Sequence, residues 1–91
     1  MKRELIMDID DVIFITGSGI VVLGTVQTEK VEVGQKVVVD PEYLPEIEAE
    51  IIGIESFRKV LKIAKQNDCV GLILSGLTKS QVKKKMKIYS L

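Results

Sequence analysis

Three carboxylates, Asp8, Asp10 and Asp11, lie close together near the start of the chain and are the first candidates for chemistry. They could hold a metal ion, but three acids at a strand junction more often cap turns and face water. The chain has no histidine, so it lacks the usual general base and the commonest metal ligand. It also has no GxxxxGK[ST] phosphate loop, and no helix is expected after the "GSG" of residues 17–19. We therefore expect no catalytic site, no metal, no cofactor and no bound nucleotide.

Cys69 is the only cysteine, so an internal disulfide is impossible and a reducing compartment is expected. It opens an apolar segment, where a cysteine usually behaves as a small buried side chain rather than as a nucleophile. The start "MKRELIMDID" has no apolar signal region, and no apolar run is long enough to cross a bilayer. These features predict a cytoplasmic protein with no membrane partner. The initial methionine and the ending "KIYSL" suggest an independent gene product.

Basic side chains concentrate near the end of the chain, where "KSQVKKKMK" contains five lysines within nine residues. Residues 1–56 carry a net charge of −8, and residues 57–91 carry a net charge of +8. A positive cluster can bind phosphates with a largely nonspecific and strongly salt-dependent affinity. The same lysines could instead form a solubilising surface that offsets the acidic half of the fold. Composition leaves both interpretations open.

The elements that would position these residues are predicted to be strands. Twelve isoleucines and twelve valines stand against eight leucines and two alanines, a ratio that favours strands over helices. A chain of 91 residues forms one domain with one core. Apolar segments separated by glycine turns predict about six or seven strands, as in a small closed barrel. We expect "DVIFIT" (11–16) and "CVGLILSG" (69–76) to be buried on both faces, and a loop at 40–46, which holds both prolines.

Glycines and changes of period predict local details. Gly24, inside a strand, marks a bulge, a bend or a close approach of another backbone, and Gly34 marks a turn before "QKVVV". The alternation in "IEAEIIGIESF" shifts near Ile52 and Gly53, which predicts a change of register. Apolar residues recur at helical spacing over 57–64 and predict a helix there. A helical turn is expected in "TKSQVKKK" and a closing strand in "MKIYSL".

The segments "IDDVIFITGSGIVVLGTVQTEKVEVGQKVVV" and "GIESFRKVLKIAKQNDCVGLILSGLTKSQVKKKMKI" resemble domain 2 of the translational GTPases, most closely that of elongation factor Tu. The family pattern is an acidic pair, a strand, "GRGTVVTGRV", a turn, "VGEEV", then "GVEMFRK" and "NVGVLLRG". The resemblance covers roughly residues 7–90, with the motifs in the same order. It implies a stand-alone, all-β domain over 1–91: a six-stranded antiparallel Greek-key β-barrel. It also implies that residues 60–68 form a turn, with the periodic apolar residues from Phe57 to Ala64 packing into the barrel.

The resemblance implies which residues would contact RNA. Glu55 matches the glutamate that contacts the terminal adenosine of transfer RNA, including its 2′-hydroxyl, a contact that can distinguish RNA from DNA. Phe57 and Arg58 match the "FRK" that follows, although Phe57 is expected in the core rather than as a stacking platform. Lys84 matches a basic position near the 5′ end of the acceptor stem. The RNA-binding residues implied in this way, with the neighbouring lysines, are Glu55, Phe57, Arg58, Lys83, Lys84 and Lys85.

Other matched positions concern docking and the aminoacyl group. Asp10 and Asp11 match the acidic pair at the domain entrance and are the predicted domain-docking residues. Ser18 stands where the family has the arginine of "GRG", and Thr25 replaces the arginine of "TGRV". Cys69 replaces an asparagine that helps to hold the aminoacyl group in the elongation factor. These departures weigh against the binding of aminoacyl transfer RNA.

A noncatalytic binding module is the expected function, with two classes of partner. The first is RNA, in particular the acceptor end of transfer RNA, which Glu55 and the lysine cluster favour. The alternative is a protein–protein interaction module that docks on a GTPase or self-associates. An enzyme is the third class, but the sequence offers it no site.

Overall fold

The computed structural model of the chain describes residues 3–15, 19–40, 46–57 and 59–91. The described chain is mostly β structure, and it contains no α-helix. One turn of 3-10 helix, η1 (Lys79–Gln81), interrupts the strands. The strands are β1 (Leu5–Asp8), β2 (Asp11–Ile15), β3 (Gly19–Thr25), β4 (Lys30–Glu32), β5 (Lys36–Asp40), β6 (Ile47–Ser56), β7 (Lys59–Leu61), β8 (Ile63–Lys65), β9 (Cys69–Ser75) and β10 (Lys87–Ser90).

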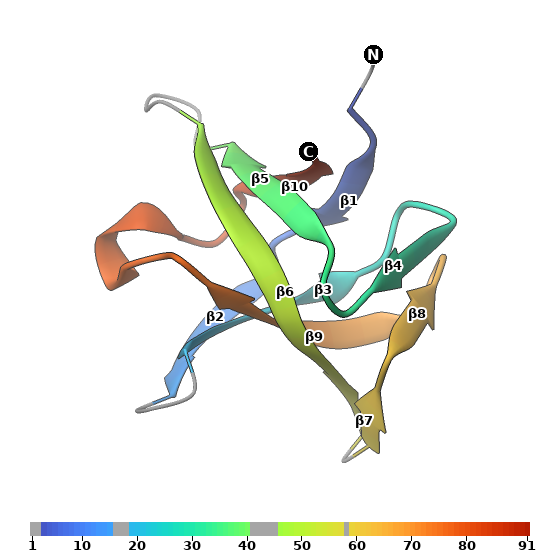
Figure 1. The fold of residues 1–91 in the computed structure, drawn as a ribbon. Helices are drawn as coiled ribbons and strands as arrows, with labels where there is room; N and C mark the ends of the chain where they lie inside the picture. Colours follow the sequence, from blue (N-terminus) through green and yellow to red (C-terminus); the bar gives the residue numbers. More distant parts are fainter. Residues whose placement is uncertain (1–2, 16–18, 41–45, 58) are drawn as a thin grey trace.

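Within the described ranges all strand pairs are antiparallel, and eight strands belong to one sheet. Its strand order is β1-β10-β5-β6-β9-β3-β2, with β7 attached to β6, while β4 and β8 form a separate pair. The long strand β6 crosses the molecule and joins β5 to β9 (Figure 1). The pairing of β6 with β9 shifts register between Ile51 and Gly53, which confirms the change predicted from the sequence.

The sheet curls, so that β1 returns beside β3. Met7 forms a β-bridge with Val26. The backbone amide of Gln27 donates to the carbonyl of Ile6 at 2.7 Å. The backbone amide of Asp10 donates to the carbonyl of Leu23 at 2.8 Å. Among the described residues this contact is a bridge with a few hydrogen bonds rather than a continuous ladder. Ten strands are described, rather than the six that the resemblance implies.

Gly24 allows the close approach of β1 to β3. A methyl group added at Gly24 would lie 2.5 Å from the carbonyl oxygen of Asp8 and 2.7 Å from Cγ of Met7. No side chain fits at such distances, so the predicted close approach of another backbone is confirmed. Gly34 has a φ of +96° in the turn before β5, as the sequence also predicted.

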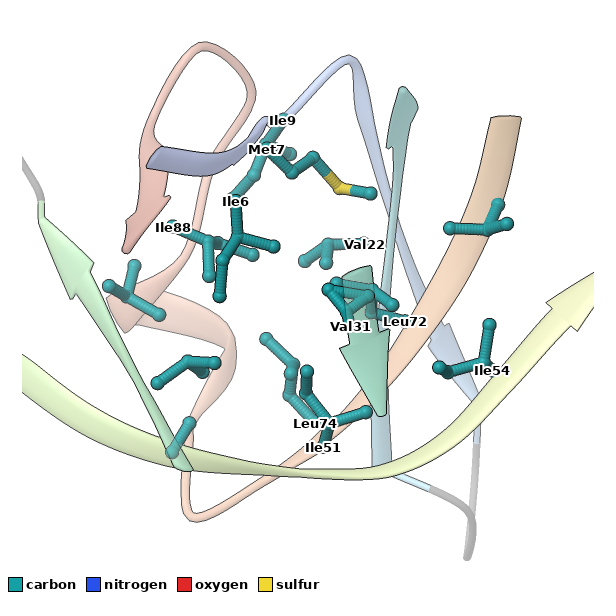
Figure 2. Packing of buried hydrophobic residues seen from close by; sticks show 14 of the residues in the cluster. Ile6, Met7, Ile9, Val22, Val31, Ile51, Ile54, Leu72, Leu74 and Ile88 are labelled. Carbon is teal, nitrogen blue, oxygen red and sulfur yellow. The ribbon is translucent and has the colours of Figure 1, made fainter. Parts of the chain in front are cut away.

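The core lies inside the curl of the sheet. Figure 2 shows side chains from β1, β3, β4, β6, β9 and β10 that point toward one another. One cross-strand row runs through it, with Val22 of β3 opposite Leu72 of β9 and Leu72 opposite Ile54 of β6. All three are fully buried. Because successive side chains alternate between faces, the next row along these strands faces outward.

Strand β2 corrects the expectation that "DVIFIT" is buried on both faces. Ile13, Phe14 and Ile15 are 44, 43 and 43% exposed. The reason is position, since β2 ends the strand order and pairs with β3 alone among the described residues. The similar segment β9 is central and mostly buried, as predicted. Thr16 lies outside the described residues.

The helix predicted over 57–64 is wrong, because this segment contains β7 and β8. Phe57 and Val60 are 88 and 81% exposed, whereas Leu61 packs against the core and Ala64 is fully buried. The tip of the β6–β7 hairpin projects past the core. The expectation that Phe57 is a core residue is therefore wrong. The helical turn and the closing strand are confirmed as η1 and β10, and residues 41–45 of the predicted loop lie outside the described residues. No helix in the described part of the chain could span a bilayer.

Candidate functional site

A surface cleft of about 300 Å³ lies where β3, β6 and β9 run side by side. It gathers residues from the β1–β2 connection, the middle of β3, the end of β6 and the start of β9. Its lining residues are Asp10, Leu23, Gly24, Glu55, Ser56, Phe57, Cys69, Val70 and Gly71. Three of these, Asp10, Glu55 and Phe57, were predicted as site residues from the sequence. The fold therefore brings together predicted residues that lie up to 47 positions apart.

The strand register explains why Glu55 faces this cleft. Leu23 of β3 lies opposite Gly71 of β9, which lies opposite Glu55 of β6. This row follows the buried row of Val22 and its partners, so it points to the outer face. Glu55 is exposed and Leu23 is half-buried. Gly71, in the middle of this row, has no side chain to fill the space between Leu23 and Glu55. A methyl group at Gly71 would lie 3.0 Å from Cδ2 of Leu23.

The end of β6 is held against the start of β9. The hydroxyl of Ser56 donates to the backbone carbonyl of Cys69 at 3.1 Å. Phe57 follows in a turn with a φ of +46°, in the left-handed region that non-glycine residues seldom adopt. Its ring is almost fully exposed at the rim of the cleft. Such backbone strain is often found at functional positions.

The cleft offers hydrogen-bond acceptors and an aromatic surface rather than a reactive group. The carboxylates of Asp10 and Glu55 accept hydrogen bonds from hydroxyl and amine donors. The Phe57 ring at the rim is free of covering side chains over most of its area, so a planar group can stack on it. The arrangement suits binding of a small group that carries hydroxyls and a ring.

Cys69 corrects the expectation of a buried thiol, because it is free and exposed. It begins β9 opposite Thr25, whose Oγ1 lies 3.5 Å from its Sγ. Its side chain points to the outer face because the inward positions of β9 are those of Val70, Leu72 and Leu74. Cys69, the first residue of an apolar segment, therefore lies on the solvent-facing side of β9.

The lysine cluster lies beside the cleft. The backbone amide of Lys85, which has a φ of +72°, donates to the carbonyl of Ile9 at 2.8 Å, and Ile9 donates to the carbonyl of Met86 at 2.9 Å. These bonds hold residues 84–86 against the β1–β2 connection. The Lys84 ammonium lies 3.7 Å from a carboxylate oxygen of Asp11, the neighbour of Asp10 in the cleft.

The predicted residues do not all meet at the cleft. Asp10, Glu55 and Phe57 line one cleft, and Lys84 pairs with Asp11 next to it. Lys83 and Lys85 are exposed on the same turn but do not line the cleft. Arg58 lies outside the described residues.

Sequence reasoning missed the floor and one wall of the cleft. Gly24 was singled out for its backbone, but its place beneath a cleft was not anticipated, and Ser56, Val70 and Gly71 were not named. The one available signal was Gly71, a glycine inside an otherwise apolar strand.

The acidic cluster near the start of the chain is divided among different partners. Asp8 pairs with Lys87, with 3.3 Å between Oδ1 and Nζ, and Asp11 pairs with Lys84. Within the described ranges no three acidic or cysteine side chains are grouped so that they could hold a metal ion.

A comparison of the sequence with models of known protein families finds no match.

Proposed function

We propose that this chain is a noncatalytic, cytoplasmic RNA-binding module, a stand-alone barrel similar to domain 2 of elongation factor Tu. In this proposal the cleft holds the 3′-terminal nucleoside of a transfer RNA acceptor end. The observation that carries it is the meeting of Asp10, Glu55 and the exposed Phe57 at one cleft, beside a turn of lysines. The curl that brings β1 beside β3 supports a six-stranded Greek-key barrel as the underlying fold.

Each part of the nucleoside finds a matching group. The base stacks on Phe57, a type of contact worth about 1–3 kcal/mol per base. Glu55 accepts a hydrogen bond from a ribose hydroxyl, which a deoxyribose end cannot supply at the 2′ position. The cleft volume of about 300 Å³ is within the range of small-molecule sites.

The phosphates must lie outside the cleft, because the carboxylates of Asp10 and Glu55 repel them. The exposed turn that carries Lys83, Lys84 and Lys85 lies next to the cleft and offers positive charge for that purpose. Phosphate contacts by these lysines would add affinity that falls with rising salt concentration, since each contact releases a counterion. The ion pair between Lys84 and Asp11 keeps one of these charges near the cleft.

The test is a titration of the protein with an acceptor-stem minihelix that ends in CCA, followed by amide NMR at low salt. We expect signal shifts at Glu55, Phe57 and Lys84. Replacing Glu55 with alanine should reduce the preference for a ribose end over a deoxyribose end. The matched control is Glu50→Ala, which removes an exposed glutamate from the same strand, away from the cleft.

The lysine contribution is tested separately. Replacing Lys83, Lys84 and Lys85 with alanine should weaken binding and reduce the slope of log affinity against log salt by about 0.7–0.9 per lost phosphate contact. The control replaces Lys30, Lys62 and Lys65, which removes the same charge around the β4–β8 pair. If excess minihelix shifts no signals at low salt, or if both triple variants lose affinity equally, the proposal is wrong. A GTPase that docks on this face would then be the better hypothesis.

A further inference from the structure

The candidate cleft has a carboxylate on each side of its floor. Strand β9 runs between β3 and β6, and its Gly71 lies opposite Leu23 on one side and Glu55 on the other. The backbone amide of Asp10 donates to the carbonyl of Leu23 at 2.8 Å, which places Asp10 on the far side of the cleft from Glu55. Both acidic residues line the cleft and are exposed. A group that lies over Gly71 therefore has one carboxylate on each side.

These two carboxylates differ from their acidic neighbours in how they are paired. Asp8 and Asp11 each form an ion pair with a lysine. In the described part of the chain no ion pair involves Asp10 or Glu55. They are also the charged members of the described cleft lining. The cleft therefore favours groups that donate hydrogen bonds and disfavours anions.

We propose that this cleft binds a 3′-terminal nucleoside whose 2′- and 3′-hydroxyls are both free, and that it rejects an end that carries a terminal phosphate. The proposal rests on the RNA-binding function proposed above and names the kind of end that is recognised. One hydroxyl donates to the carboxylate of Glu55, and the other donates to the carboxylate of Asp10. Two donors then meet two ionised acceptors, and hydrogen bonds to ionised acceptors are stronger than those between neutral groups.

A terminal phosphate removes donors and adds repulsion. A 3′-phosphate replaces the 3′-hydroxyl, and a 2′,3′-cyclic phosphate replaces both hydroxyls. Each also brings negative charge over the floor of the cleft, about one strand spacing, or about 5 Å, from the strand on either side. At that separation the repulsion between two unit charges weakens binding about fourfold even at the dielectric constant of water. Two carboxylates therefore weaken binding by about tenfold or more.

This preference selects the products of one class of RNA cleavage. When water attacks the phosphorus and the bond from phosphorus to the 3′-oxygen breaks, that oxygen takes up a proton and a free diol remains. When the 2′-hydroxyl attacks instead, the bond from phosphorus to the 5′-oxygen breaks and a 2′,3′-cyclic phosphate remains. The cleft accepts ends made by the first reaction and rejects ends made by the second.

The test compares three acceptor-stem minihelices that differ only at the 3′ end, which is a free diol, a 2′,3′-cyclic phosphate or a 3′-phosphate. Affinity is measured by fluorescence anisotropy at low salt. The free diol should bind about tenfold more tightly than either phosphate, and the difference should shrink as salt rises because exposed charges are screened. Cys69 is exposed and lines the same cleft, so at equal concentration the free-diol minihelix should slow its alkylation most.

Substitutions that remove charge but keep an oxygen acceptor test the mechanism. Glu55→Gln and Asp10→Asn should each lower the preference over the 3′-phosphate end about fourfold, and the double variant should abolish most of it. The matched control is Glu50→Gln, which removes an exposed charge from β6 away from the cleft and should leave the preference unchanged. Circular dichroism of each variant verifies that it is folded.

The outcomes separate this inference from the function on which it rests. Equal affinity for the three ends overturns the inference and leaves RNA binding in place. A preference that the double variant retains in full also overturns the inference, because the carboxylates would then not be its cause. If none of the three minihelices binds at low salt, RNA binding itself fails, and the inference fails with it.

Discussion

A single methyl group at Gly24 should strongly destabilise the protein. In Gly24→Ala the added carbon would lie 2.5 Å from the carbonyl oxygen of Asp8, 2.7 Å from Cγ of Met7 and 2.9 Å from its Sδ. The first of these atoms is backbone, so β1 and β3 must move apart to relieve the clash. Overpacking of this kind costs about 1–3 kcal/mol, and we expect the upper end because a strand must shift.

That loss is large for a chain of this length. A 91-residue domain has a free energy of unfolding of about 5–14 kcal/mol. At roughly 4–8 °C per kcal/mol, a cost of about 3 kcal/mol lowers Tm by about 12–24 °C. The assay is urea unfolding monitored by circular dichroism, with a thermal scan of the same samples.

Gly53→Ala is the matched control, because Gly53 also lies in a strand but its added carbon meets a side chain only. The atom that it would contact most closely, Cδ1 of Ile73 at 2.9 Å, is the flexible end of a partly exposed side chain that can rotate away. We expect Gly53→Ala to change the free energy of unfolding by less than about 1 kcal/mol. Equal losses in the two variants, or a Gly24→Ala protein as stable as the wild type, would refute the close approach of β1 to β3.

Three further predictions use single sites. Cys69, which is exposed, should react with a maleimide in the native protein as fast as in the unfolded chain, and protection of the native thiol would contradict its placement. Phe57→Ala should lower the free energy of unfolding by less than about 0.5 kcal/mol, because Phe57 is 88% exposed. Ile54→Ala should lower it by about 2–5 kcal/mol, because Ile54 is fully buried. Similar losses in the two variants, measured by urea unfolding, would count against the hairpin geometry. The hydrogen bond and charge of Glu32 raise the pKa of Lys30 above its usual 10.5. The pair should therefore stabilise the fold at neutral pH, and this stabilisation should be lost as pH rises through the raised pKa of Lys30. In unfolding measured as a function of pH, Glu32→Gln should abolish that alkaline loss of stability.

Much of the candidate site was predictable one residue at a time. Glu55 and Phe57 are two positions apart at a strand end, and the resemblance to a known domain drew attention to them and to Asp10. Their meeting at one cleft was not predictable from local pattern, because it depends on the register of β9 between β3 and β6. Gly71 takes part in the site only through that register.

The sequence by itself determined the features that depend on near neighbours. The excess of isoleucine and valine favours strands, glycines mark the turn at Gly34 and the close approach at Gly24, and broken alternation marks the register shift after Ile51. Each follows from the conformations open to a short stretch of chain. The helical spacing over 57–64 misled for the same reason, since a hairpin can reproduce it by chance.

Only the tertiary structure decided which apolar strand is covered. Residues 12–15 and 70–74 are similarly apolar, yet β2 lies at the end of the strand order while β9 lies between β3 and β6. A strand is buried when other strands cover it. Which strands cover it depends on long-range pairing, and no local sequence pattern contains that information. The same cause placed Cys69 and Phe57 in solvent, because one faces outward at the start of its strand and the other lies at the tip of a hairpin beyond the core.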